Sequence, residues 1–360
     1  MGPQKNFAGL CQVLFYYKIR VFLLKETALR TTGSQAARAT ASRRRKIHGA
    51  GSVQGQPRPN PMSDTLASLR RQRASAGDLQ SVVRSMKALA ASGIGQYEQS
   101  VHALADYYRT IELGLGVCFR DLGPTVHHEA FTTTQDSGAI GAIVFGSDQG
   151  LVGQFNDLIA DHAVKTIAKL GGTAQVWAVG ERVHARLVDA GMTPIGLFSV
   201  PSSVKGIASL VGRIQVESEN HRALGEYARL YVFHNRPQSG ALYEPTAQRL
   251  LPLDEHWQQD LTTVAWPTHL LPQIMAGSRE TIRVLIREYL FISLFRACAE
   301  SLASENASRL AAMQRADKNI DDLIEDVQSR FHRLRESGID EELFDVISGF
   351  EALRGDGRHV

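Results

Sequence analysis

A long proline-free stretch lies at each end of this chain of 360 residues. No proline occurs between Met62 and Gly123, or anywhere after Pro272. Because proline breaks a helix interior, each stretch can form one continuous helix. At about 1.5 Å per residue, residues 64–114 would span roughly 75 Å and residues 278–353 roughly 110 Å. Helices of that length exceed a compact core, so we expect them to pair with each other.

Apolar residues recur at helical spacing in both stretches and predict the seam along which the two helices meet. The first stretch offers Leu79, Val82, Met86 and Leu89, then Ile94, Tyr97, Val101, Leu104, Tyr108 and Ile111. The two sets are out of step, which predicts a register shift near Ala91-Ser92-Gly93. The last stretch offers Leu310, Met313, Ile320, Leu323, Ile324, Val327, Phe331 and Leu334, with the polar Asp317 as an interruption.

The middle of the chain, about 137–265, alternates short apolar runs with helical stretches. The expected strands are Ala139–Phe145, Ala174–Val179 and Ala228–Phe233. The expected helices lie near 156–170, after Val179 through Leu187, and at 204–216. This alternation is typical of a mostly parallel sheet. Segments 234–252 and 266–272, which contain Pro or Gly, are predicted to be loops or edges. The expected fold class is α/β, with two long terminal helices forming an antiparallel coiled coil and a central Rossmann-like domain.

The first 61 residues differ in composition from the rest. They hold eleven Lys or Arg and one acid, a charge of +10, whereas the whole chain carries +3, so the body carries −7. Three interpretations stay open: an organellar transit peptide, a nucleic-acid-binding arm, or upstream translation before a start at Met62. In each case we expect a disordered extension outside the fold. The mildly acidic body argues against nucleic-acid binding.

These patterns predict four segments: an extension at 1–61, a coiled-coil helix at 62–115, an α/β domain with flanking loops at 116–272, and a coiled-coil helix with a short tail at 273–360. Cys11, Cys118 and Cys298 lie far apart, which argues against a disulfide scaffold and for a reducing compartment. No apolar run is long enough to predict a membrane-spanning helix.

Two patterns invite a ligand. The glycines of Gly146–Gly153 follow a predicted strand, where such a loop can hold a phosphate. Their spacing does not match GxGxxG, and GxxxxGK[ST] is absent from the chain. His127-His128-Glu129 lacks a third metal ligand and the HExxH pattern. We therefore predict a structural turn, no cofactor and no metal.

Four separated motifs resemble those of a known family. Ser147-Asp148-Gln149-Gly150-Leu151-Val152-Gly153-Gln154-Phe155-Asn156 is similar to S-D-x-G-L-C-G-x-x-N. Residues 82–92 resemble I-T-x-A-M-x-M-V-A-A-S, and residues 304–313 resemble S-E-x-x-A/S-R-M-x-A-M. Residues 331–335 and 349–353 resemble Y-N-x-x-R and G-A-x-A-L. In this order, from about Met62 to Leu353, they resemble the gamma subunit family of rotary F-type ATP synthases.

The resemblance implies a non-catalytic central-stalk rotor without a cofactor. Its paired helices would turn inside a ring of alpha and beta subunits, and its α/β domain would lie beside the epsilon subunit and the c-subunit ring. The implied location is the cytoplasmic face of a bacterial cell membrane, as a peripheral protein. The implied contacts with the ring are Arg84, Met86, Lys87, Arg309, Arg335, Glu336, Asp340 and Glu342. The implied structural turn contains Ser147, Asp148, Gly150, Gly153 and Asn156.

Some positions depart from the family. Gln80-Ser81-Val82-Val83 stand where the family commonly has T-R near the start of the first motif. Glu336, Gly338 and Asp340 stand where it usually has Gln, Ala or Ser, and Thr. These departures put the polar contacts with the beta subunits in doubt and favour a divergent subtype, such as the alternative bacterial F-type ATPases. The coupling ion, proton or sodium, stays open.

Two other function classes remain from the residues alone. An α/β enzyme with helical arms would need a nucleophile–base or metal arrangement, and we identify none in the sequence. A coiled-coil scaffold or DNA-binding adaptor would explain the long helices, but neither the α/β insert nor the acidic body. Co-purification distinguishes all three, because only a rotor subunit elutes with alpha and beta subunits.

Overall fold

The computed structural model describes residues 65–122, 139–238, 243–269, 272–275 and 277–355. The chain divides into two units after Met62. The first unit holds the predicted extension at 1–61, which lies outside the described residues. His127-His128-Glu129 lie outside them as well.

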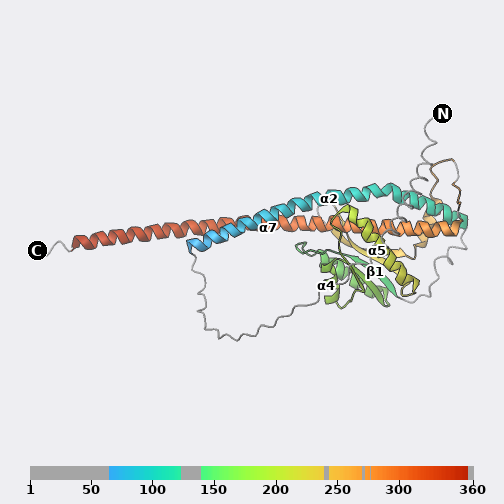
Figure 1. Ribbon diagram of the computed structural model, residues 1–360, viewed down its shortest axis with the longest axis horizontal. Helices are drawn as coiled ribbons and strands as arrows, with labels where there is room; N and C mark the ends of the chain where they lie inside the picture. Colours follow the sequence, from blue (N-terminus) through green and yellow to red (C-terminus); the bar gives the residue numbers. More distant parts are fainter. Residues whose placement is uncertain (1–64, 123–138, 239–242, 270–271, 276, 356–360) are drawn as a thin grey trace, which may run out of the picture. The chain divides into compact units, whose positions relative to one another are not determined.

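Two long helices pack against each other in opposite directions (Figure 1). The first, α2, runs from Leu66 to Leu122, and the last, α7, from Ser278 to Gly355. Early residues of α2 meet late residues of α7: Arg84 pairs with Asp317, whereas the Tyr107 hydroxyl donates to Glu288 at 2.7 Å. The predicted antiparallel pair is confirmed, although α2 continues beyond the expected boundary at 115. Among the described residues, no helix combines the length and the apolar character needed to cross a membrane.

The buried seam of α2 repeats every seven residues, which is the period of a coiled coil. Its buried members are Leu69, Ala76, Val83, Ala90, Tyr97, Ile111 and Cys118. On α7 the same period links Ile292, Ala299, Met313, Ile320 and Val327. The predicted register shift at 91–93 is therefore wrong, because the seam passes through that segment in step.

Part of the predicted seam was also wrong. Leu79, Val82 and Leu89 of α2 are 53%, 55% and 73% exposed, and Leu323 of α7 is 49% exposed. The prediction followed the largest apolar side chains. The structure instead buries small ones, such as Ala76 and Ala90, where the two helices come close.

The middle of the chain forms a five-stranded sheet in the order β3-β2-β1-β4-β5. The strands are β1 Ile140–Phe145, β2 Ala174–Val179, β3 Gly196–Phe198, β4 Arg229–Pro237 and β5 Tyr243–Leu251. The first four are parallel, and β5 pairs antiparallel with β4 at one edge. The four parallel strands follow the order 3-2-1-4 of the doubly wound Rossmann arrangement, so the predicted Rossmann-like domain is confirmed. Segment 234–252, expected to be loop or edge, supplies the end of β4 and the edge strand β5, where Pro245 is tolerated.

Helices cover both faces of the sheet. The helices α3 Phe155–Leu170 and α4 Glu181–Asp189 lie on one face, and α5 Val204–Ala223 lies on the other. The short helix α6, Glu255–Thr263, packs against α2. Alternate residues of β1 point to opposite sides: Ala142 and Val144 pack in a core with α3 and α4. Ile143 and Phe145 pack in the larger core with α2, α5 and α7. The helix α7 therefore packs against α2 and also closes the core of the domain.

Candidate functional site

The turn after β1 is held together by its own side chains. The Asn156 side chain accepts a hydrogen bond from the Ser147 backbone N–H at 2.9 Å and donates one to the Ser147 Oγ at 2.8 Å. Ser147 is completely buried. Gly153 adopts a φ of 57°, in the left-handed region that suits glycine. Polar groups of this loop are therefore engaged within the protein.

Asp148 ties the same turn to two neighbouring segments. Its Oδ1 accepts from the Glu181 backbone N–H at 3.0 Å, at the first residue of α4, and its Oδ2 accepts from Val200 N–H at 2.8 Å. Glycine at position 180 lets the start of α4 lie close to Ser147, because a Cβ there would be 2.7 Å from the Ser147 carbonyl oxygen. The carboxylate satisfies a backbone donor that a helix start leaves unpaired.

We expect Asp148→Ala to lower the free energy of unfolding by about 1–2 kcal/mol, because two backbone donors lose their acceptor. Asp148→Asn keeps one acceptor oxygen and should lose less. Chemical denaturation of the full chain, followed by circular dichroism, measures both. Equal stability of Asp148→Ala and the wild type would show that water replaces these bonds without cost.

Two serines of α7 fasten that turn and β4 to the long helix. Ser308 donates from its Oγ to the Val152 carbonyl at 2.5 Å, and Ser304 donates to the Asn235 carbonyl at 2.9 Å. Asn235 in turn donates to the Phe155 carbonyl at 3.0 Å. We call this contact region between the sheet and α7 the sheet–helix joint.

Buried charges reinforce the sheet–helix joint. Glu300 of α7 contacts His234 Nε2 of β4 at 2.8 Å and Arg296 Nε at 2.6 Å. Burial alone would raise the pKa of Glu300, but the hydrogen bonds from His234 and Arg296 outweigh it and lower that pKa to about 2. The carboxylate therefore stays ionised, bridging the strand and the helix.

A second buried pair lies one turn further along α7. Arg309 Nη2 contacts Glu305 Oε1 at 2.7 Å, and the two side chains are only 12% and 8% exposed. Burial raises the pKa of Glu305, Asp148 adds to this effect, and Arg309 opposes it.

Sequence reasoning singled out Arg309, but it missed His234 and Glu300. No motif marks those two, since their pairing joins residues far apart in the sequence.

The remaining predicted contact residues fall into three groups. Arg84 and Lys87 of α2 each lie 3.3 Å from Asp317 of α7, so they pair within the chain. Met86 packs beside the small core of Ala76, Val83, Met313 and Ile320. The others lie exposed on α7: Arg335, Glu336, Asp340 and Glu342.

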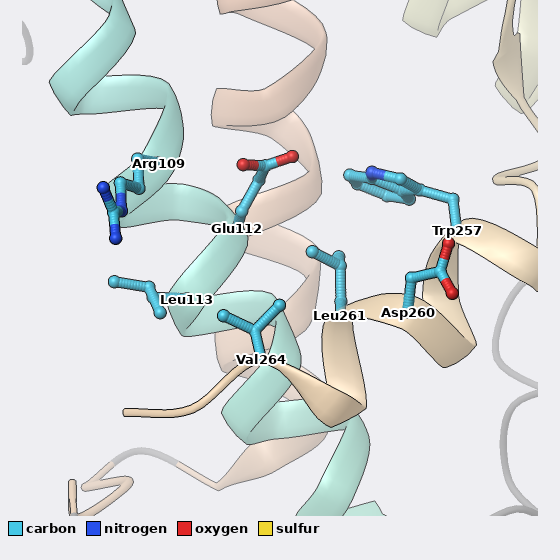
Figure 2. A pocket seen from close by; sticks show the side chains of 7 residues that line it. All are labelled: Arg109, Glu112, Leu113, Trp257, Asp260, Leu261 and Val264. Atoms are coloured by element: carbon cyan, nitrogen blue, oxygen red, sulfur yellow. The ribbon is translucent and has the colours of Figure 1, made fainter. Parts of the chain in front are cut away.

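A cavity of about 380 Å³ lies between α2 and α6. Figure 2 shows Leu261 between Val264 and Trp257, with Arg109, Glu112 and Leu113 on the neighbouring α2. Burial raises the pKa of Glu112 in its wall. A side chain at Gly116 would meet the Leu261 carbonyl oxygen at 2.4 Å, so glycine lets α6 approach α2. Within the described ranges, no three His, Cys, Asp or Glu side chains group as metal ligands.

Comparisons with known proteins agree with this architecture. A family model described as ATP synthase matches residues 65–353. The ATP synthase gamma chain of Glaesserella parasuis serovar 5 (strain SH0165) is 26% identical over 297 residues, covering 78% of this chain and 96% of that protein. A chain of the Euglena gracilis mitochondrial ATP synthase (OSCP/F1/c-ring, rotational state 3) shares the fold, with a TM-score of 0.52 and 15% identity over 82% of this chain and 96% of that one. This chain belongs to the ATP synthase gamma-chain family.

Proposed function

We propose that the chain is a non-catalytic subunit that transmits torque between the membrane sector and the nucleotide sites of an ATP synthase. The observation that carries this proposal is the continuity of α7. The helix closes the core of the sheet through residues such as Ile292, pairs with α2, and continues to Gly355. Since Arg70 lies over Phe331 at 5.3 Å and α2 begins only four residues earlier, most of α7 after Phe331 extends beyond its partner helix.

Different parts of the chain would contact different partners. The paired helices and the last part of α7 would meet the alpha and beta subunits, whereas the sheet domain would meet the epsilon subunit and the c-subunit ring. The protein would then lie at the cytoplasmic face of a bacterial cell membrane without inserting into it. Family membership and the absence of a spanning helix among the described residues support this arrangement.

The exposed end of α7 offers the best candidates for contacts with the ring. Its charged candidates are Arg335, Glu336, Asp340 and Glu342, and its exposed apolar residues include Ile339, Leu343, Val346 and Phe350. Arg84 and Lys87 would have to share their charge between Asp317 and a beta subunit. Arg309 would contribute indirectly, because its guanidinium is engaged by Glu305 inside the sheet–helix joint.

A rotor needs no reactive group of its own. A partner shifts a conformational equilibrium only when it interacts differently with the competing states. Helices that present a different side to each beta subunit would supply that difference. Rotation would therefore change the nucleotide sites in turn.

Co-expression with the alpha and beta subunits of the same source tests the proposal. With an affinity tag on beta, the chain should elute in one large assembly that hydrolyses ATP, whereas the isolated chain should hydrolyse none. A chain that begins at Met62 serves as a matched variant and should assemble equally. Elution of the full chain alone, or ATP hydrolysis by the isolated chain, would contradict the proposed role.

A further inference from the structure

Two apolar stripes run along the first half of α2, and only one faces α7. The stripe that faces α7 contains Leu69 and three smaller side chains, those of Ala76, Val83 and Ala90. The other stripe is made of larger side chains and is mostly exposed: Leu79, Val82 and Leu89. Leu89 and Ala90 are neighbours in the sequence, and neighbouring positions of a helix point about 100° apart. A rotation of α2 by about that angle would exchange the two stripes.

Burial of apolar surface does not explain which stripe faces α7. Leu79 and Leu89 offer more apolar area than Ala76 and Ala90, and each Å² removed from water contributes about 25 cal/mol. On this term alone the larger stripe would pack inward. Close packing of the two helices at the small side chains opposes this term, and a polar interaction on the seam can oppose it as well.

Asp317 of α7 provides a polar interaction at the right place. It lies between Met313 and Ile320 on the seam, and its side chain is only 15% exposed. Three side chains of α2 reach its carboxylate: Gln80 at 3.5 Å, Arg84 at 3.3 Å and Lys87 at 3.3 Å. Gln80 and Arg84 also contact Asp321, one turn further along.

The α2 side chains that reach Asp317 share one face of the helix. Positions 80, 84 and 87 follow the spacing of four and three that aligns helical neighbours. Val83 lies among them and packs in the seam, so the polar contacts form only when Val83's face is turned inward. Rotating α2 to bury Leu79 and Val82 would carry Arg84 and Lys87 away from Asp317.

Two glycines lie near the middle of α2. Gly93 and Gly95 lie between the two halves, and glycine weakens a helix interior by about 1 kcal/mol relative to alanine. A Cβ at Gly95 would meet nothing within 4 Å, whereas a Cβ at Gly93 would lie 3.1 Å from the Asn306 side chain of α7. The seam stays in step through this segment, so a rotation of the first half of α2 would have to be absorbed at these glycines.

We propose that Asp317 is a positioning residue that selects which stripe of α2 packs against α7. A single polar residue in a coiled-coil seam is known to specify register at some cost in stability. Asp317 thereby keeps Leu79, Val82 and Leu89 on the outer surface of α2. The inference refines the proposed rotor, because it decides which side chains α2 presents to its surroundings, but its test needs only the folded chain.

Adjacent cysteines report which stripe is outward. Leu89 is 73% exposed and Ala90 is 1% exposed. In the otherwise unchanged full chain, Leu89→Cys should react with a maleimide at least about tenfold faster than Ala90→Cys, since a buried thiol reacts only after local opening. Mass spectrometry of the peptides separates these sites from the native Cys118 and Cys298, which are buried.

Adding Asp317→Leu should bring the ratio of the two rates close to one or invert it. Glu325→Ala, an exposed change on the same helix, should leave the ratio unchanged. The charge exchange Arg84→Asp with Asp317→Arg should restore the ratio that Asp317→Arg alone reduces.

If Asp317→Leu does not fold, Asp317→Asn keeps the shape without the charge and should still lower the ratio. A ratio that stays at its wild-type value in the folded Asp317 variants would overturn the inference, whatever their melting temperature.

Discussion

Val327→Pro is expected to leave ATP hydrolysis in an assembled ATP synthase but to abolish ion pumping. Val327 is 3% exposed and lies on the seam of α7, one heptad after Ile320. Proline removes a backbone donor and clashes with the preceding turn, which costs about 3 kcal/mol or more and kinks the helix. Because α7 links the sheet domain to its own C-terminal part, the kink interrupts torque while the nucleotide sites of the ring keep their residues.

Glu325→Ala is the matched control on the same turn of α7. Glu325 is exposed, and an exposed ion pair contributes only about 0–1 kcal/mol, so hydrolysis and pumping should both stay near wild type. Both activities are measured on the same reconstituted vesicles. A proline variant that pumps with an unchanged ratio to hydrolysis would show that α7 does not act as a continuous shaft.

The second large effect is expected at the sheet–helix joint. Glu300→Ala removes the acceptor of His234 and Arg296 and leaves buried polar groups without their partner. Breaking a buried pair in this way costs about 3–5 kcal/mol. Asp326→Ala breaks a half-exposed pair with Arg330 on the same helix and should cost no more than about 0.5 kcal/mol. Chemical denaturation of the full chain, followed by circular dichroism, compares the two.

The same carboxylate gives a pH dependence of defined sign. The pKa of Glu300 falls from an ordinary 4.5 to about 2 in the folded protein, so its ionised form stabilises the fold. This contribution, on the order of 3 kcal/mol, is complete above about pH 4.5 and is lost as the pH falls toward 2. Glu300→Gln should lack it. If wild type and Glu300→Gln lose stability in parallel over that window, Glu300 is not held ionised by its neighbours.

The sequence predicted the architecture well because its strongest signals are local. The proline-free stretches predicted both long helices, and the apolar run Ala174–Val179 coincides with β2. The sequence predicted neither β3 nor α6, because Gly196–Phe198 is too short to show a pattern and Glu255–Thr263 is mostly polar. Both elements depend on packing against distant segments.

The joint and the seam were harder to predict for a related reason. Ser304 and Glu305 were visible as a motif, but nothing in the sequence brings His234 to Glu300. On α2, large side chains such as Leu89 suggested the seam, whereas the structure buries Ala90. Small residues on a close helix contact and polar contacts such as Arg84 with Asp317 decide that choice, and a count of apolar residues contains neither.

Rotation of single assemblies tests the central claim most directly. Lys165→Cys, exposed on α3, offers a site for a visible probe, with Cys11→Ser added and Cys118 and Cys298 buried. With the ring of alpha and beta subunits fixed to a surface, ATP should drive rotation of the probe in one direction, and rotation should stop when ATP is removed. A probe that stays fixed while the same assemblies hydrolyse ATP would contradict the claim that this chain is the rotor.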